Sequence, residues 1–97
     1  MEMFNPPHPG LVLKDALEGT SITVAAFAAH LGVSRNTVSR ILNERSAITP
    51  DLSIRIAEAF GQKQTDFWFR LQGQYDFWQA KQARRKKIHM LKFARAA

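Results

Sequence analysis

Polar side chains suited to DNA bases and phosphates recur over ten residues near the middle of the chain. Arginine can donate two parallel hydrogen bonds to O6 and N7 of guanine, and asparagine can form a matching pair with N6 and N7 of adenine. Serine and threonine hydroxyls can bind phosphate oxygens. The candidate DNA-contacting residues are Ser34, Arg35, Asn36, Thr37, Ser39, Arg40 and Asn43.

The stretch Thr23–Asn43 must position these side chains, and its pattern predicts two short helices joined by a tight turn. Gly32 suits a left-handed helix stop, and Ser34 can cap the second helix by accepting a backbone N–H bond. Val38 and Ile41 then face inward by helical spacing. This is the helix-turn-helix pattern, whose second helix enters the major groove of DNA. An ordinary solvated helix face is the alternative, but the turn, the inward residues and the outward chemistry agree on DNA.

Other candidate chemistry is weak. His8, His30 and His89 are far apart in the sequence without the spacing of metal ligands, and the chain has no cysteine. Asp66 and Asp76 are better interpreted as a helix-start charge and a surface charge than as a catalytic pair. No nucleophile–base pairing or glycine-rich phosphate loop stands out in the sequence. We therefore predict neither an enzyme nor a site for a metal or cofactor.

Length and apolar patterning bound the class of protein. The 97 residues suffice for one domain with a single modest core. The longest apolar run, Val24 to Ala29, is far too short to cross a bilayer. The first ten residues lack the basic residues and the long apolar core of a signal peptide. We therefore expect a cytoplasmic protein with no membrane partner.

The net charge of +6 is unevenly distributed. Residues 1–79 contain seven Lys/Arg and all eight Asp/Glu, a balance of −1, whereas residues 80–97 contain seven Lys/Arg and no acid, a balance of +7. We predict a helix-turn-helix DNA-binding and dimerisation domain over 1–79 and a basic tail over 80–97, which either extends the last helix or frays. Contact with DNA phosphates, contact with an acidic partner and a solvated, mobile end all remain open for this tail.

Helix signals recur along the domain and no strand pattern stands out, so the predicted fold is all-α with five helices. The first runs from Pro9 to a stop at Gly19, with Leu11, Val12 and Leu17 available to the core. The others are expected over about 24–31, 35–43, about 50–60 and from about 66 to at least 80. The side of the fourth helix expected to face inward consists of Leu52, Ile56, Ala57 and Phe60.

The last helix has two apolar sides. At about 100° per residue, one arc gathers residues expected to pack on the preceding helices, namely Phe67, Trp68, Leu71, Tyr75 and Trp78. Phe69, Gly73 and Phe77 fall on another side, which needs a second partner. The simplest partner is the same helix of a second copy, with Gly73 allowing close approach. Aromatic binding of a flat ligand is the alternative, but aromatic residues at helical spacing are more often core.

Three segments carry a family resemblance: the opening His8-Pro9-Gly10, the segment LGVSRNTVSRILNERSAITPDLSIRIAEAFG and the later DFWFRLQGQYDFW. Together they resemble the HigA-type antitoxins, the addiction-module antidotes of the Xre-like helix-turn-helix class, over about residues 5–79. By position, the resemblance implies a recognition helix with Arg35, Asn36, Thr37, Ser39 and Arg40, supported internally by Val33, Val38 and Ile41. Leu11 departs from the family pattern, which often has Glu at that position.

The resemblance implies a five-helix, phage-repressor-like (Xre/Cro) domain with a long C-terminal helix. It also implies a homodimer that represses its own operon by binding a palindromic operator, and that neutralises a RelE/HigB-like mRNA-endonuclease toxin. A free-standing Xre-family regulator without a toxin partner would present the same DNA-binding face. A helical adaptor whose motif has lost DNA binding is a further alternative, favoured by the balance of −1 over residues 1–79.

Overall fold

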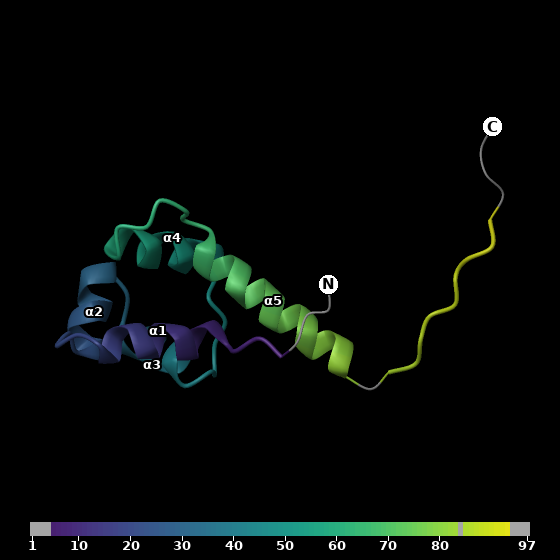
Figure 1. Cartoon of the computed structure of the whole chain (residues 1–97), viewed down its shortest axis with the longest axis horizontal. Helices are drawn as coiled ribbons and strands as arrows, with labels where there is room; N and C mark the ends of the chain where they lie inside the picture. The colour runs from purple at the N-terminus through teal and green to yellow at the C-terminus, as the bar shows by residue number, and fades with distance from the viewer. Residues whose placement is uncertain (1–4, 84, 94–97) are drawn as a thin grey trace.

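Five α-helices make up the computed structural model, which describes residues 5–83 and 85–93. They are α1 (Pro9–Glu18), α2 (Val24–Leu31), α3 (Arg35–Leu42), α4 (Pro50–Ala59) and α5 (Phe67–Gln82). Figure 1 shows α1 to α4 around a common centre, with α5 starting beside α4 and running outward. The described residues contain no strand, so the prediction of an all-α fold with five helices is confirmed.

Side-chain caps start the helices where the sequence predicts them. Thr23, Ser34 and Thr49 each accept a hydrogen bond from the backbone N–H three residues further on, at 3.1 to 3.2 Å. Pro50 follows the last of these caps at the first position of α4. Gly32 ends α2 in the left-handed region at φ +79°. Interactions within a few residues therefore set the helix boundaries around the turn.

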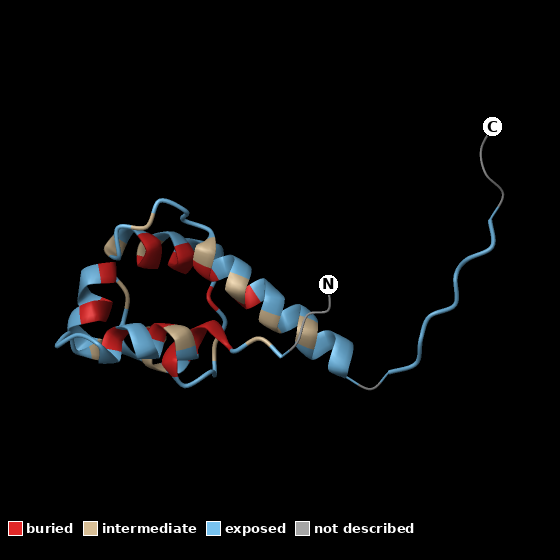
Figure 2. Cartoon of the chain, in the orientation of Figure 1, coloured by how far each residue is buried: buried red, intermediate tan, exposed pale blue. Residues whose placement is uncertain are grey.

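The core lies between the first four helices and the start of α5, and Figure 2 shows buried positions on the sides of these helices that face one another. The buried apolar residues are Leu13, Leu17, Phe27, Ala28, Leu31, Val38, Ile41, Leu42, Ile48, Leu52, Ile56, Ala57 and Trp68. Ile48 comes from the loop between α3 and α4 and is only 1% exposed. That loop is therefore anchored in the core.

Helix α1 buries Leu17 as expected, but the rest of its buried side differs from the expected one. Leu11 is 39% exposed, whereas Leu13, absent from the expected set, is 1% exposed. Pro9, Leu13 and Leu17 are spaced four apart and share one face of the helix, while Leu11 points away from it. Val12 is half-buried at the edge of the core. The expectation for Leu11 was wrong because close packing of α1 against α3 decides which face is buried.

The end of α4 also departs from the expectation. Phe60 is the C-cap residue and is 37% exposed, although the other residues predicted to face inward from α4 are buried. Its ring centroid still lies 5.7 Å from that of Phe27 and 6.1 Å from that of Trp68. Phe60 therefore covers the rim of the core and is not part of its interior.

Helix α5 packs on the domain through the predicted arc. Trp68 is buried, and its indole Nε1 donates a hydrogen bond to Gln62 Oε1 at 2.7 Å. The half-buried members of the arc are Phe67, Leu71, Tyr75 and Trp78. The helix ends at Gln82, and residues 85–93 have no regular secondary structure. Among the described helices, none combines the length and the apolar character needed to cross a membrane.

Candidate nucleic-acid interface

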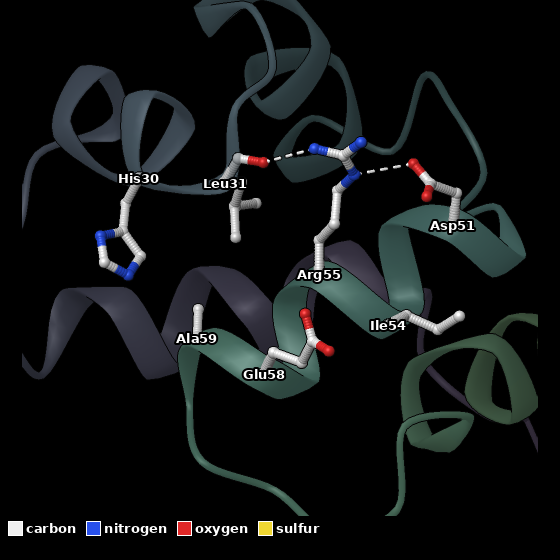
Figure 3. Close-up of a pocket in the computed structure, with 7 residues that line it drawn as sticks. All are labelled: His30, Leu31, Asp51, Ile54, Arg55, Glu58 and Ala59. Atoms are coloured by element: carbon white, nitrogen blue, oxygen red, sulfur yellow. Dashed lines mark hydrogen bonds and ion pairs between the residues drawn. The ribbon is translucent and has the colours of Figure 1, made fainter.

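The turn between α2 and α3 is held from outside by α4. Arg55 Nη1 donates to the carbonyl of Leu31 at 2.7 Å, and Arg55 Nε donates to Asp51 Oδ2 at 2.8 Å (Figure 3). A Cβ added to Gly32 would lie 3.1 Å from Arg55 Nη1, so the glycine also leaves room for the guanidinium. Nothing in the sequence pattern marks Arg55, because its partner Leu31 lies 24 residues away.

A pocket lies beside the Arg55 hydrogen bonds, between α2 and α4 (Figure 3). It is lined by His30, Leu31, Asp51, Ile54, Arg55, Glu58 and Ala59. Its central Arg55 is already paired with Leu31 and Asp51, so the guanidinium stabilises the fold. No group of three or more histidines or carboxylates among the described residues could hold a metal ion. The candidate interface is therefore the surface of α3.

Helix α3 buries one side and presents the other to solvent, as its spacing predicts. Val38, Ile41 and Leu42 are buried, and Val33 is half-buried against the core. The seven candidate residues define what we call the α3 surface: exposed Ser34, Arg35, Asn36, Arg40 and Asn43, and half-buried Thr37 and Ser39. All seven are accessible from solvent on α3 or at its caps.

Hydrogen bonds hold several of these side chains in place before any ligand binds. Ser34 Oγ accepts the Thr37 N–H at 3.1 Å and lies 2.8 Å from Thr37 Oγ1. At the other end of the helix, Asn43 Nδ2 donates to Ser39 Oγ at 3.4 Å. The first turn of a helix also directs backbone N–H groups outward, which suits a phosphate oxygen. The start of α3 is thus suited to a DNA backbone contact.

Arg40 is oriented by the loop that follows α3. Its Nε donates to Ser46 Oγ at 2.9 Å, and its Nη2 donates to the Arg45 carbonyl at 3.3 Å. These bonds use one edge of the guanidinium, so Nη1 and the remaining N–H of Nη2 form a second, available edge. Two parallel donors of this kind match O6 and N7 of guanine.

A left-handed residue at the end of α3 brings this loop back to Arg40. Glu44 has φ +61° and is the one non-glycine residue with positive φ in the described part of the chain. The Glu44 N–H donates to the Ile41 carbonyl at 3.0 Å, and the Arg45 N–H donates to the Arg40 carbonyl at 2.8 Å. This is the Schellman pattern that ends many helices. The resulting reversal places Ser46 beside the Arg40 guanidinium.

The start of α1 supports the far end of α3. A Cβ added to Gly10 would lie 1.9 Å from the Ile41 carbonyl oxygen, so only glycine permits this approach of the two helices. His8 caps α1, because its Nδ1 accepts the Gly10 N–H at 2.9 Å. The His8 ring also packs edge-on against Tyr75, with centroids 4.9 Å apart. The segment from His8 to Gly10 therefore joins α1, α3 and α5.

Burial governs the charge of His8, whose side chain is 4% exposed. Loss of hydration lowers its pKa below the ordinary 6.5, against the opposing effects of the Glu44 and Asp76 charges and of a hydrogen bond with the Ser46 backbone. Nδ1 must be unprotonated to accept the Gly10 N–H. Neutral His8 is therefore the form that caps α1.

A buried glutamine ties the loop after α3 to α5. Gln72 is 3% exposed; its Oε1 accepts the Ile48 N–H at 2.8 Å, and its Nε2 donates to Asp76 Oδ1 at 3.0 Å. Periodicity alone does not select a polar residue for a buried position, and Ile48 is 24 residues away in sequence. The loop that follows α3 is consequently positioned by α5.

The outer face of α5, formed by Phe69, Gly73 and Phe77, is left open by the described chain. Phe69 is 44% and Phe77 is 59% exposed. A Cβ added to Gly73 would meet no atom within 4 Å. Lys81 Nζ lies over the Phe77 ring, 5.8 Å from its centroid. The face is exposed as expected, and its role as a dimer contact stays a prediction.

The fold and the α3 surface define the general class of protein. A family model described as helix-turn-helix matches residues 13–68, and the chain belongs to that family. Antitoxin HigA-1 of Vibrio cholerae is 33% identical to this chain over 88 residues, which are 90% of this chain and 82% of that protein. Virulence-associated protein A′ of Dichelobacter nodosus is 35% identical over 89 residues, which are 92% of this chain and 77% of that protein.

Solved structures agree with these relatives. An addiction module antidote protein of the HigA family from Coxiella burnetii is 36% identical, with a TM-score of 0.73 over 79% of this chain and 84% of that one. The Pseudomonas aeruginosa antitoxin HigA, solved with the higBA promoter, is 37% identical, with a TM-score of 0.73 over 77% of this chain and 82% of that one. The chain belongs to the HigA-type antitoxins of the Xre-like helix-turn-helix class, as its three segments predict.

Proposed function

We propose that this protein is the cytoplasmic antitoxin of a type II toxin–antitoxin module and the repressor of its own operon. The observation that carries the proposal is the α3 surface, where Arg40 is oriented by Ser46 and by the Arg45 carbonyl. The similarity to the Pseudomonas aeruginosa antitoxin HigA, whose structure includes the higBA promoter, supports the same function. On this proposal, the guanidinium edge that Arg40 keeps available contacts a base in the operator.

The proposed operator is palindromic and the proposed repressor is a homodimer. Two recognition helices must reach half-sites about 34 Å apart, one turn of DNA, which one chain with a single α3 cannot do. The outer face of α5 supplies a contact between two copies, because Phe69 and Phe77 remain largely exposed in the single chain. Gly73 between them leaves space for close approach of the second helix.

The proposed protein partner is a RelE/HigB-like toxin, an mRNA endonuclease, which this chain binds and neutralises. Support comes from family membership, since the similar chains include antitoxin HigA-1 and an addiction module antidote protein. A free-standing regulator would have the same α3 surface but would bind no toxin.

Titration of the protein with its own upstream DNA and with a random duplex tests DNA recognition. Arg35→Ala and Arg40→Ala should each weaken operator binding by about 1–3 kcal/mol, roughly 5- to 150-fold, and reduce discrimination against random DNA. Thr37→Ala should weaken both duplexes to a similar extent, as phosphate contacts do. Lys63→Ala, in the loop before α5, is the control and should change neither.

Equal losses on both duplexes for all three α3 variants would contradict the proposed base contacts. The absence of any operator preference in the wild-type protein at moderate salt would contradict both DNA-binding proposals and favour the helical adaptor. Co-expression with the neighbouring gene separates the other two functions. A complex that purifies together and relieves growth arrest supports the antitoxin, while no complex and no relief favour the free-standing regulator.

A further inference from the structure

The excess of positive charge lies outside residues 1–79, which include the α3 surface. Residues 1–79 have a balance of −1 and residues 80–97 a balance of +7. Helix α5 ends at Gln82, and every residue from 85 to 93 is exposed without regular secondary structure (Figures 1 and 2). We call residues 85–93 the basic arm, whose cationic side chains are Arg85, Lys86, Lys87 and Lys92.

We propose that the basic arm is a second DNA-binding element, which binds the phosphate backbone without regard to sequence. This inference rests on the proposed function, because the arm would act on DNA that α3 has selected. Binding to phosphates through cations displaces condensed counterions and supplies much of the affinity of DNA-binding proteins. A domain with a balance of −1 gains little long-range attraction to a polyanion from its net charge, and a separate cationic segment can supply it.

The pattern of the arm favours DNA over an apolar groove on a protein. Its four large apolar side chains, Ile88, Met90, Leu91 and Phe93, are between 72% and 89% exposed. In a helix at about 100° per residue they would be spread around most of the circumference. In a strand, Ile88 and Met90 would lie on one side and Leu91 and Phe93 on the other. Neither conformation gathers the apolar side chains on one face, so the arm lacks the surface that an apolar groove on a protein would bind. An extended arm can instead follow a DNA strand and place its cations along the phosphates.

Apolar side chains also have a place at DNA. Arms and loops that enter the minor groove combine cations with apolar residues that pack against sugars or wedge between base steps. The apolar side chains of the arm, Ile88, Met90, Leu91 and Phe93, therefore add affinity that does not depend on salt, while the cations add the part that does.

The salt dependence of binding tests the proposal. The dissociation constant is measured between about 50 and 200 mM salt for the wild type and for a variant with Arg85→Gln, Lys86→Gln, Lys87→Gln and Lys92→Gln, on operator and random duplexes. Each phosphate contact contributes about 0.9 to the slope of log affinity against log salt. With four cations in each of two copies, the slope should fall by about 4 to 7 on both duplexes. The ratio of operator to random affinity should stay within about twofold.

Two controls isolate the arm. A Lys14→Gln, Lys63→Gln variant removes exposed cations from the domain and should leave the slope unchanged. An Ile88→Ser, Leu91→Ser variant keeps every cation and should lower affinity without changing the slope. Thermal unfolding of all variants should match the wild type, because these side chains lie outside the core.

A slope that the four Gln substitutions leave unchanged would overturn the proposal. Loss of toxin binding with an unchanged slope would do so too, and would assign the arm to a protein partner. If the wild-type protein does not prefer its operator, only the proposed function is contradicted. The salt dependence of binding to random DNA still tests the proposal for the basic arm.

Discussion

The α3 surface and the outer face of α5 are both exposed, but they differ in what the single chain provides for them. On the α3 surface, Ser34 and Arg40 have partners within the chain at 2.8 to 3.3 Å. On the outer face of α5, Phe69 and Phe77 are exposed, and a Cβ added to Gly73 would meet no atom within 4 Å. The single chain orients side chains on the first surface and leaves the second largely uncovered.

The two surfaces are accordingly suited to different kinds of contact. Side chains that are already oriented lose little conformational entropy on contact with DNA, so the α3 surface is suited to specificity. Two exposed phenyl rings gain free energy mainly by being covered, which suits association with another apolar face. Three substitutions and one change of pH test this comparison, from the largest expected effect to the smallest.

Phe77→Glu should have the largest effect, because it places a charge where a second copy is proposed to pack. We expect monomers by light scattering and operator binding weaker by about 100-fold or more, since two linked half-site contacts become independent. Gln79→Glu adds the same charge at an exposed position of α5 and serves as the control. A Phe77→Glu protein that remains a dimer would show that the outer face of α5 is not the dimer interface.

Gly10→Ala tests whether the α3 surface depends on its support from behind. The new methyl group would meet the Ile41 carbonyl, so we expect a loss of about 1–3 kcal/mol in the free energy of unfolding, measured with urea. Gly19→Ala is the matched control, since its Cβ would lie 3.7 Å from the nearest atom, the Ala16 carbonyl oxygen. Equal stability of the two variants would show that α1 and α3 can separate without cost.

Ser46→Ala tests the orientation of Arg40. Removing the acceptor for Arg40 Nε should cost about 0.5–1.5 kcal/mol of operator affinity with little change on random DNA. Ser46→Thr keeps the hydroxyl and should retain most of the affinity. In an Arg40→Ala background the same Ser46→Ala change should have no further effect. Full additivity of the two substitutions would show that Ser46 acts independently of Arg40.

Acidification should have the smallest effect, through His8. Its pKa is lowered by burial in the folded chain, so the unfolded chain binds more protons below the ordinary value of 6.5. Stability is therefore retained above pH 6.5 and lost as the pH falls toward the folded pKa. His8→Asn keeps a side-chain cap acceptor but does not titrate. The melting temperature of this variant should fall less between pH 7.5 and 5.5 than that of the wild type, and an equal fall would contradict this role of His8.

Interactions that act within about four residues could be predicted from the sequence. The caps at Thr23, Ser34 and Thr49 and the left-handed stop at Gly32 are where the residue types indicate. The arc of α5 that packs inward also follows, because helical periodicity is a property of consecutive residues. The order of five helices and the exposed set on α3 result from these local signals, and the three family segments add the class of protein.

Only the tertiary structure showed which residues from different helices and loops contact one another. Arg55 clamps the turn through Leu31, and Gln72 holds the loop through Ile48, each across 24 residues of sequence. Leu13 is buried and Leu11 exposed because Gly10 brings α1 against the end of α3. Such contacts depend on which faces meet, and periodicity allows more than one choice of face. The sequence by itself therefore determined the helices and the chemistry of α3, while packing determined how rigidly that chemistry is held.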